Sequence, residues 1–277
     1  YQELNAEESK NFGPGVLDED TITLPLLGAV VDGTLTDVTG TEYMFIQDED
    51  RTIYYLSLQD EWNVVTDWTL TLGVRYDEYS DFGSTVNPRA ALVWETKHNL
   101  TTKFLYGRAF RAPSFAELFT ANNPIVAGNP DLDPEVINTY EIAFDFRPRH
   151  NLRTGLNIFY YEIDDLIEFV AEPGLTSSTA QNVGEQEGQG IEVEGSWTIR
   201  PDLTLNANYA FQNTEDSNGD PTPNAPENQA YLQLIWQFSP NWFASTQGSW
   251  IGDRQRSADD DRADIDDYTL VDLTVGC

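Results

Sequence analysis

The feature that most constrains this chain is an alternation of apolar and polar side chains over stretches of about ten residues. It is clearest in LTLNANYAFQN, residues 203–213, where one face carries Leu, Leu, Ala, Tyr and Phe and the other is almost purely polar. The next run, AYLQLIWQF at 230–238, repeats the pattern. Because successive side chains of a strand point to opposite faces, this period of two predicts β-strands with one apolar face.

The same alternation recurs in 68–79, 138–146 and 190–199 and predicts roughly ten or eleven strands. We expect most of them to be about 9–12 residues long, a length that crosses a bilayer when the strand is tilted. Short connections alternate with long ones, a layout typical of outer-membrane barrels with periplasmic turns and extracellular loops. The expected short connections are 64–67, 97–99, 147–151, 200–202 and 239–241; the long ones are 80–86, 111–137, 165–188, 213–228 and 252–266.

A soluble antiparallel sandwich or barrel would also alternate apolar and polar faces. Its strands are usually shorter, about 5–6 residues. Aromatic residues also gather near the expected strand ends, as they do in the interfacial girdles of membrane barrels: Trp62, Trp68, Tyr76, Tyr79, Trp197, Trp242 and Trp250. The sequence therefore favours an all-β fold, an antiparallel transmembrane β-barrel. We expect residues 43–277 to form a partial barrel truncated before its last strands, and residues 1–42 an extracellular loop region with the end of an upstream hairpin.

Composition excludes several classes of protein. The 277 residues carry 15 Lys and Arg against 47 Asp and Glu, a formal charge of −32, which disfavours a nucleic-acid partner. No apolar run is long enough for a transmembrane helix, and the only cysteine, Cys277, leaves no disulfide within the chain. We find no G-x-S-x-G, no H-E-x-x-H and no nucleophilic Cys, so we expect no enzyme and no cofactor.

Two segments resemble a known family. YGRAFRAPSFAELF (106–119) and AGNPDLDPEVINTYEIAFDF (127–146) are similar to the C-terminal half of TonB-dependent outer-membrane transporters. Further pieces follow the family's order, namely YYLSLQDEWNV (54–64), LTLGVRYDEYSDFG (70–83), NPRAALVW (87–94) and YTLVDLTVG (268–276). The resemblance implies part of a barrel of about 22 strands with a plugged lumen, embedded in the outer-membrane lipid of a Gram-negative bacterium. It also implies a TonB complex as partner, engaged through a plug domain that is absent from this sequence.

The resemblance further implies active uptake of a scarce nutrient, with a ferric siderophore as the default ligand. Cobalamin, haem, another organic ligand or a passive porin-like channel remain alternatives. Haem with a histidine ligand from this half is disfavoured, because the interval SFAELFTANNPIVAG (114–128) has no His. His98 and His150 both fall in expected short turns.

Candidate site residues fall into two groups. The charged residues on the face opposite the apolar stripe are expected to face the lumen: Arg75, Asp77, Lys103, Glu141, Asp145, Glu192 and Glu194. Of these, we expect Arg75 and Lys103 to pair with carboxylates of the lumen or with groups of the plug. The FRAP segment, Phe110–Pro113, and the residues around it are expected in an outer loop. There they contact the ligand or, as the favoured alternative, shape the loop. The residues concerned are Arg108, Arg111, Phe115, Glu117, Phe119, Asn122 and Asn123.

Local chemistry supports the loop assignment. Tyr106 is expected to end the lipid-facing stripe, with Arg108 on the same face beyond it. Pro113 has no N–H to donate to a ladder and ends pairing there, and Ser114 with Glu117 forms an S-x-x-E capping box for a short helix. The acidic run 257–267 lacks the spacing and the glycine of a calcium loop, so a solvated acidic loop is favoured over a calcium site and no metal site is assigned.

Overall fold

A computed structural model gives the fold. It describes residues 46–277 except 122, 124, 174–176, 258–259 and 264, together with the backbone of five short strands before residue 46. Within these residues the chain is almost entirely strand, with one short helix. The elements are β1 Gln2–Ala6, β2 Asn11–Phe12, β3 Leu17–Asp18, β4 Ala29–Val30, β5 Leu35–Thr36, β6 Glu49–Val65, β7 Trp68–Tyr79, β8 Gly83–Lys97, β9 Leu100–Arg111, α1 Phe115–Phe119, β10 Val126–Ala127, β11 Glu135–Arg149, β12 Leu152–Ala171, β13 Ser178–Arg200, β14 Leu203–Asp216, β15 Pro226–Ser239, β16 Trp242–Arg254 and β17 Tyr268–Gly276.

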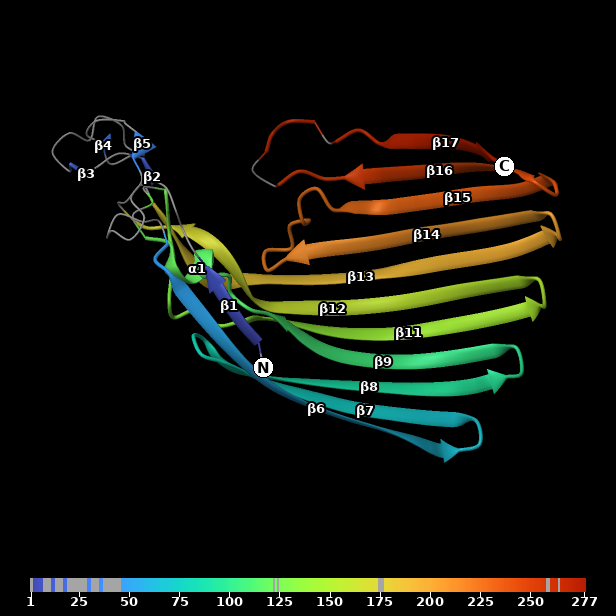
Figure 1. The fold of residues 1–277 in the computed structure, drawn as a ribbon, viewed down its shortest axis with the longest axis horizontal. Helices are drawn as coiled ribbons and strands as arrows, with labels where there is room; N and C mark the ends of the chain where they lie inside the picture. Colours follow the sequence, from blue (N-terminus) through green and yellow to red (C-terminus); the bar gives the residue numbers. More distant parts are fainter. Residues whose placement is uncertain are drawn as a thin grey trace.

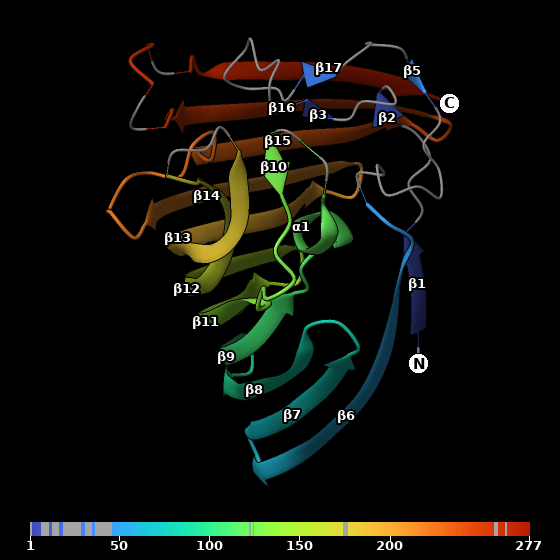
Figure 2. The same ribbon diagram turned by 90° about the vertical axis from the view of Figure 1, so that its left-hand side faces the viewer.

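The long strands form one antiparallel sheet in nearly sequential order. Its path is β1-β6-β7-β8-β9-β11-β12-β13-β14-β15-β16-β17, and β10 adds to β13 in parallel. Five tight turns join strand pairs at one end of the sheet, whereas α1 and the longer connections lie at the other end (Figure 1). Viewed along the strands, the sheet curves like an open trough with α1 in its hollow (Figure 2). The prediction of an antiparallel barrel portion with about ten or eleven long strands is confirmed.

The expected strand lengths and some of the expected long loops were wrong. β12 has 20 residues and β13 has 23, and the connection at 80–86 is a tight turn at Ser80–Phe82 followed by β8. The connection expected at 165–188 is mostly strand, because β12 and β13 stay paired as far as Ala171 and Ser178. Polar segments outside a membrane still gain ladder hydrogen bonds, so loss of the apolar stripe does not mark the end of a strand.

Polar and apolar side chains separate onto the two faces of the sheet. Arg51 on β6 reaches α1, so the face that it shares with Tyr55, Ser57 and Gln59 is the concave one. The opposite, convex face carries large apolar side chains that remain exposed, such as Leu72 (42%), Val193 (45%) and Leu232 (55%). In the described residues only Ile53, Leu118, Leu132 and Ala180 are buried hydrophobic side chains. The chain thus turns its apolar surface outward.

Aromatic side chains mark both ends of the convex face. Trp68 stacks on Trp94 at 4.9 Å near the short turns. Tyr106, Tyr140 and Tyr160 form a row across β9, β11 and β12 at the other end, with ring centroids 5.2 and 6.3 Å apart. On β7, eight residues separate Trp68 from Tyr76, about 26 Å along a strand, close to the ~25 Å apolar band of membrane barrels. No helix in the described part of the chain is long and apolar enough to cross a membrane.

A charge on the convex face tests this arrangement. Leu72→Arg places a guanidinium halfway between Trp68 and Tyr76, where an arginine facing lipid costs about 2–4 kcal/mol. We expect the urea midpoint of the full-length protein in lipid vesicles to fall accordingly. Thr71→Arg is the matched control, since its side chain lies on the concave face, and it should unfold close to the wild type. Equal losses in the two variants would contradict the assignment of the faces.

Candidate functional site

The FRAP segment turns the chain from β9 into a short helix at the outer end of the trough. β9 ends at Arg111, and Ser114 is the N-cap of α1, Phe115–Phe119. The Ser114 side chain accepts a hydrogen bond from the Glu117 N–H (3.2 Å), while the Glu117 carboxylate accepts from the Ser114 N–H (2.7 Å). The capping box predicted from the sequence is therefore formed.

Arg111 ties this helix to β11 through two carboxylates. It donates to both oxygens of Glu117 at 3.0 Å and to both carboxylate oxygens of Glu135, with an Nη2–Oε1 distance of 2.5 Å. Glu135 also accepts a hydrogen bond from the Ile167 N–H at 2.9 Å, which connects the pair to β12. Burial raises the pKa of Glu117, but the hydrogen bonds from Arg111 and Ser114 outweigh that effect, so the pKa lies below its ordinary value.

A second arginine, Arg51, fastens the same segment from the β6 side. Its side chain is 6% exposed and donates to the Pro113 carbonyl at 2.7 Å and to Asp81 Oδ2 at 2.7 Å. The guanidinium lies 4.8 Å from the ring of Phe115 and 5.2 Å from that of Phe82. Since Asp81 is also almost fully buried, the pair joins the β7–β8 turn to the FRAP segment in a place that water does not reach.

The rest of the loop packs onto the extended hairpin of β12 and β13. Leu118 of α1, Leu132 and Ala180 form a small apolar core. Asn182 holds the end of the turn NPDL, Asn129–Leu132. Its amide oxygen accepts from the Asp133 N–H at 2.9 Å, and its amide nitrogen donates to the Asp133 carbonyl at 2.9 Å. The outer loop is therefore a folded unit with its own core, joined to β6, β11, β12 and β13.

Most residues expected to contact ligand hold this loop together instead. Phe115 lies against Arg51, and Phe119 packs against the Leu118 core. Asn123 Oδ1 accepts from the N–H groups of Ile125 and Val126 at 2.9 and 3.2 Å. Asn122 lies outside the described residues. These contacts support the loop-shaping role, while ligand contact stays a prediction.

Arg108 differs from the other loop residues. It is exposed, pairs in register with Asn138 and shares the convex face with Tyr106. Among the described residues it has no hydrogen bond or ion-pair partner. Its position next to the tyrosine row is the one that the sequence predicted for it.

The seven residues predicted to face the lumen all lie on the concave face. Arg75 donates to Asp77 (Nη2–Oδ1 2.6 Å) and stacks over Tyr55, and Asp77 is fully buried. Glu141 accepts from Asn157 at 2.9 Å, and Asp145 accepts from Arg153 at 2.6 Å.

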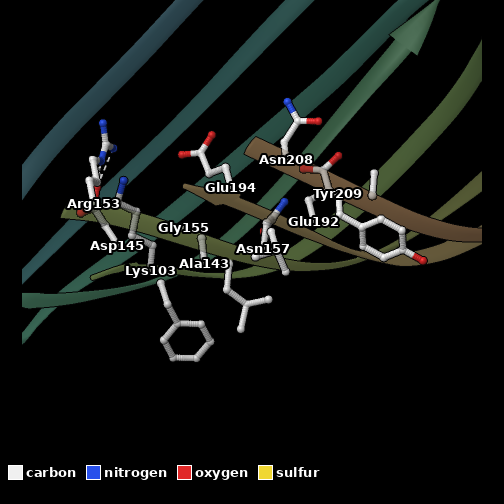
Figure 3. Close-up of a pocket in the computed structure, with 14 residues that line it drawn as sticks. Lys103, Ala143, Asp145, Arg153, Gly155, Asn157, Glu192, Glu194, Asn208 and Tyr209 are labelled. Atoms are coloured by element: carbon white, nitrogen blue, oxygen red, sulfur yellow. Dashed lines mark hydrogen bonds and ion pairs between the residues drawn. The ribbon is translucent and has the colours of Figure 1, made fainter. Parts of the chain in front are cut away.

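Arg75 therefore has the carboxylate partner expected of it. Lys103 lines a cavity of about 440 Å³ with Glu192 and Glu194, without a direct contact. Arg153 projects over this cavity beside Asp145, as Figure 3 shows. Arg153, Asn157 and Arg89 were not identified from the sequence, although their alternation parity places them on the polar face.

Neutral side chains hydrogen-bond across the other part of the concave face. Ser196, Asn206, Gln233 and Gln247 are register partners on β13 to β16, and Asp272 follows on β17. Successive side chains are linked at 2.8, 3.1, 3.5 and 3.4 Å. This row satisfies its own polar groups across five strands.

No group of three or more His, Cys, Asp or Glu in the described residues is placed to hold a metal ion. In the acidic loop after β16, Asp260 instead accepts hydrogen bonds from Arg262 (2.6 Å) and Arg256 (3.4 Å). The Arg262 guanidinium is the main reason why the pKa of Asp260 falls to about 2. Its two arginine partners make this aspartate part of a locally neutralised turn.

Comparison with known proteins decides the family. The sequence model of the TonB-dependent receptor-like β-barrel matches residues 20–277. The chain belongs to this family. This receptor barrel is 26% identical over 241 residues to an iron-regulated outer membrane virulence protein of Vibrio cholerae, and 26% identical over 244 residues to the vitamin B12 transporter BtuB of Photobacterium profundum. Outer-membrane localisation, predicted from the sequence, is confirmed, and the expectation that the chain is no enzyme agrees with a family of receptors.

Solved structures agree on the fold of the barrel. A variant of the ferric enterobactin receptor PfeA of Pseudomonas aeruginosa, bound to enterobactin, superimposes with a TM-score of 0.76 at 18% identity, covering 86% of this chain and 39% of that one. The siderophore receptor PirA of Acinetobacter baumannii gives 0.71 at 15% identity, covering 83% and 40%. The two curated relatives are matched over 79% and 85% of this chain but only 37% and 38% of their own length.

Removal of Arg51 measures how much its buried ion pair with Asp81 contributes to the stability of the receptor. Arg51→Met leaves Asp81 buried without a cation, and breaking a buried pair costs about 3–5 kcal/mol. We expect a lower thermal unfolding midpoint for the full-length receptor in detergent, with partial recovery in Arg51→Met/Asp81→Leu. Arg147→Met is the control, because its pair with Asp145 is exposed and worth about 0–1 kcal/mol. An unchanged midpoint in Arg51→Met would contradict a stabilising role of the Arg51–Asp81 pair.

The pKa of Glu117 predicts a dependence of α1 on pH. A carboxylate whose pKa is lowered by folding stabilises the fold above its unfolded pKa, about 4.3, and that contribution is lost as the pH falls through the folded pKa. In the full-length receptor with Cys277→Ser, a nitroxide on Ala121→Cys should stay immobile from pH 7 down to the ordinary carboxyl range. It should become mobile only at lower pH.

The matched variant Glu117→Gln removes the titrating group. We expect its label to be more mobile than that of the parent at neutral pH, and to change little on acidification. A pH response that survives in Glu117→Gln would assign the transition to another group.

Proposed function

We propose that this chain is the barrel part of a TonB-dependent transporter that takes up a ferric siderophore across the outer membrane. The observation that carries the proposal is the division of the sheet in this family member, with an apolar exterior band and a charged concave wall. Charges on a dry inner face would cost several kcal/mol each unless paired. A lumen filled with water and a plug removes that cost, and it gives a polar ligand a route.

Two features support iron as the cargo. One curated relative is named for its regulation by iron, and the fold is shared with receptors named for siderophores. Haem bound through a histidine is disfavoured, because His98 and His150 lie at the short-turn end of the sheet, away from α1. Energy would come from TonB through a plug domain carried by the rest of the receptor.

Cobalamin uptake is the second candidate. The Photobacterium relative named as a vitamin B12 transporter matches 85% of this chain at 26% identity. The iron-regulated relative has the same sequence identity. The outer loop does not separate the two ligands, since its described residues mostly contact one another. A passive porin is a weaker alternative, because the family match favours a gated receptor.

Growth of a deletion strain separates these candidates. We expect a strain without the full-length receptor to lose growth on at least one ferric siderophore as the sole iron source, and to regain it with the wild-type gene. Cobalamin-dependent growth of the same strain, in a background that cannot make the vitamin, is the control and should be unchanged.

The energy source distinguishes a transporter from a pore. Uptake should vanish when TonB is deleted, whereas a passive channel would continue. Loss of cobalamin growth with normal iron growth would replace the siderophore by the second candidate.

A further inference from the structure

One arginine of the concave face lacks the carboxylate partner that most of its neighbours have. Arg51 pairs with Asp81, Arg75 with Asp77, and Arg153 with Asp145. Arg89 on β8 has no carboxylate oxygen within 4.0 Å among the described residues, and it donates only to the amide oxygen of Gln59. In a chain with 47 acidic residues, an unpaired cation on an inner wall needs an explanation.

The backbone is shaped so that Arg89 lies flat across a neighbouring strand. Arg89 pairs in register with Gly73 on β7, which in turn pairs with Gln59 on β6. A Cβ added at Gly73 would stand 2.9 Å from Nε and 3.0 Å from Cγ of Arg89. A side chain at this position would therefore force the flexible Arg89 side chain to shift from the path by which it reaches Gln59 two strands away. Gly107, the register partner of Arg89 on β9, has open space on its face.

The Arg89 side chain, where it crosses Gly73, lies in a groove that contains further polar groups. Ser57, Gln59, Arg75, Asn87 and Arg89 line a cavity of about 380 Å³. The Asn87 amide donates to Thr85 at 2.9 Å, and its other amide atom is buried without a partner. Because the two ends of an amide are assigned from their partners, a rotated Asn87 presents an N–H to the groove and accepts from the Thr85 hydroxyl.

We propose that this groove is a subsite for an oxyanion, a carboxylate or catecholate oxygen of the transported chelate, with Arg89 as its principal donor. A guanidinium offers five N–H donors in a planar fork that matches such oxygens, and Arg89 uses few of them. Asp77 neutralises the adjacent Arg75. Arg89, and Arg108 which also lines the cavity, therefore keep their positive charges uncompensated by a carboxylate of the described residues. Six residues separate Arg89 from Gly83, about 20 Å along the strand, so the subsite lies inside the trough and not at its rim.

The inference rests on the proposed function, because it assigns a step on the route of the ligand. The same oxygen chemistry could come from another part of the receptor, such as a carboxylate of the segment that fills the lumen. The two sources differ in when they bind. A carboxylate of the receptor would stabilise the protein without ligand, whereas the chelate acts only during uptake.

Uptake by cells carrying the full-length receptor tests the subsite. The probes are 55Fe-labelled ferric enterobactin and ferric citrate, which are anionic, and ferrichrome, which is uncharged. For an anionic chelate that the wild type transports, we expect Arg89→Gln to lower uptake about ten-fold. This is the fold-change that corresponds to losing the free energy of one hydrogen bond to a charged group. Binding of that chelate at the cell surface should change little, and Arg89→Lys should recover part of the uptake.

A pair of glycine variants provides the matched control. Gly73→Ala forces Arg89 to shift and should lower uptake by less than Arg89→Gln, whereas Gly107→Ala enters open space and should behave as wild type. Arg149→Gln removes an exposed positive charge at the short-turn end and controls for net charge. Each variant is first compared with the wild type in thermal unfolding without ligand.

The outcomes are distinct. Absence of iron uptake in the wild type contradicts the proposed function itself. Normal uptake of the anionic chelate in Arg89→Gln, or transport of ferrichrome alone, overturns the subsite. A destabilised Arg89→Gln receptor whose uptake per folded receptor is normal also overturns it, and assigns Arg89 to a carboxylate of the receptor.

Discussion

Pairing of backbone N–H and C=O groups is the constraint on which the rest of this structure depends. In a hydrocarbon layer every unpaired backbone group costs several kcal/mol, so strands can cross only as members of a closed sheet. The 13-stranded sheet supplies this pairing from β7 to β16 on both edges. The described part of β1 pairs with only 49–53 of β6, and β17 ends the strand order. The two edges are where a larger barrel would continue, in agreement with relatives more than twice as long as the matched region.

The same ladder, continued beyond the aromatic rows, creates a platform for the outer loop. β12 and β13 remain paired well past Tyr160, and the loop from Arg111 to Asp133 packs against that extension. A loop of this length would lose much conformational entropy on ordering. Its small core alone offers little compensation, since in the described residues it consists of Leu118, Leu132 and Ala180, with Pro113 as a further buried side chain of the loop. The ion pairs of Arg51 and Arg111, partly removed from water, are the contacts that fix its position.

Sequence reasoning reached the sheet and its two faces because alternation is a local property. Three features follow from residues close together in the chain: the short turns, the placement of Arg75 and Glu192 on the polar face of their strands, and the capping box at Ser114. Strand length did not follow, because strands outside the membrane have water on both faces and lose their pattern. The β11 partner of Arg111 did not follow either, since Glu135 is 24 residues away and comes alongside only through the register of β9 with β11. Asn182 and Asp133, 49 residues apart, could not be paired by any spacing rule.

The concave wall divides into a charged and a neutral part, and that division suggests where its contacts lie. On this face β14, β15 and β16 carry no charged side chain within 204–212, 229–237 and 243–251, all of which are described. Asn206, Gln233 and Gln247 on these strands hydrogen-bond to one another. The stretch from β7 to β13 instead carries Arg75, Arg89, Lys103, Glu192 and Glu194, and several of these groups have no partner on the wall. Charged groups in a confined space attract groups of opposite charge more strongly than they do in open water. Whatever occupies the lumen therefore gains most by contacting the charged part of the wall.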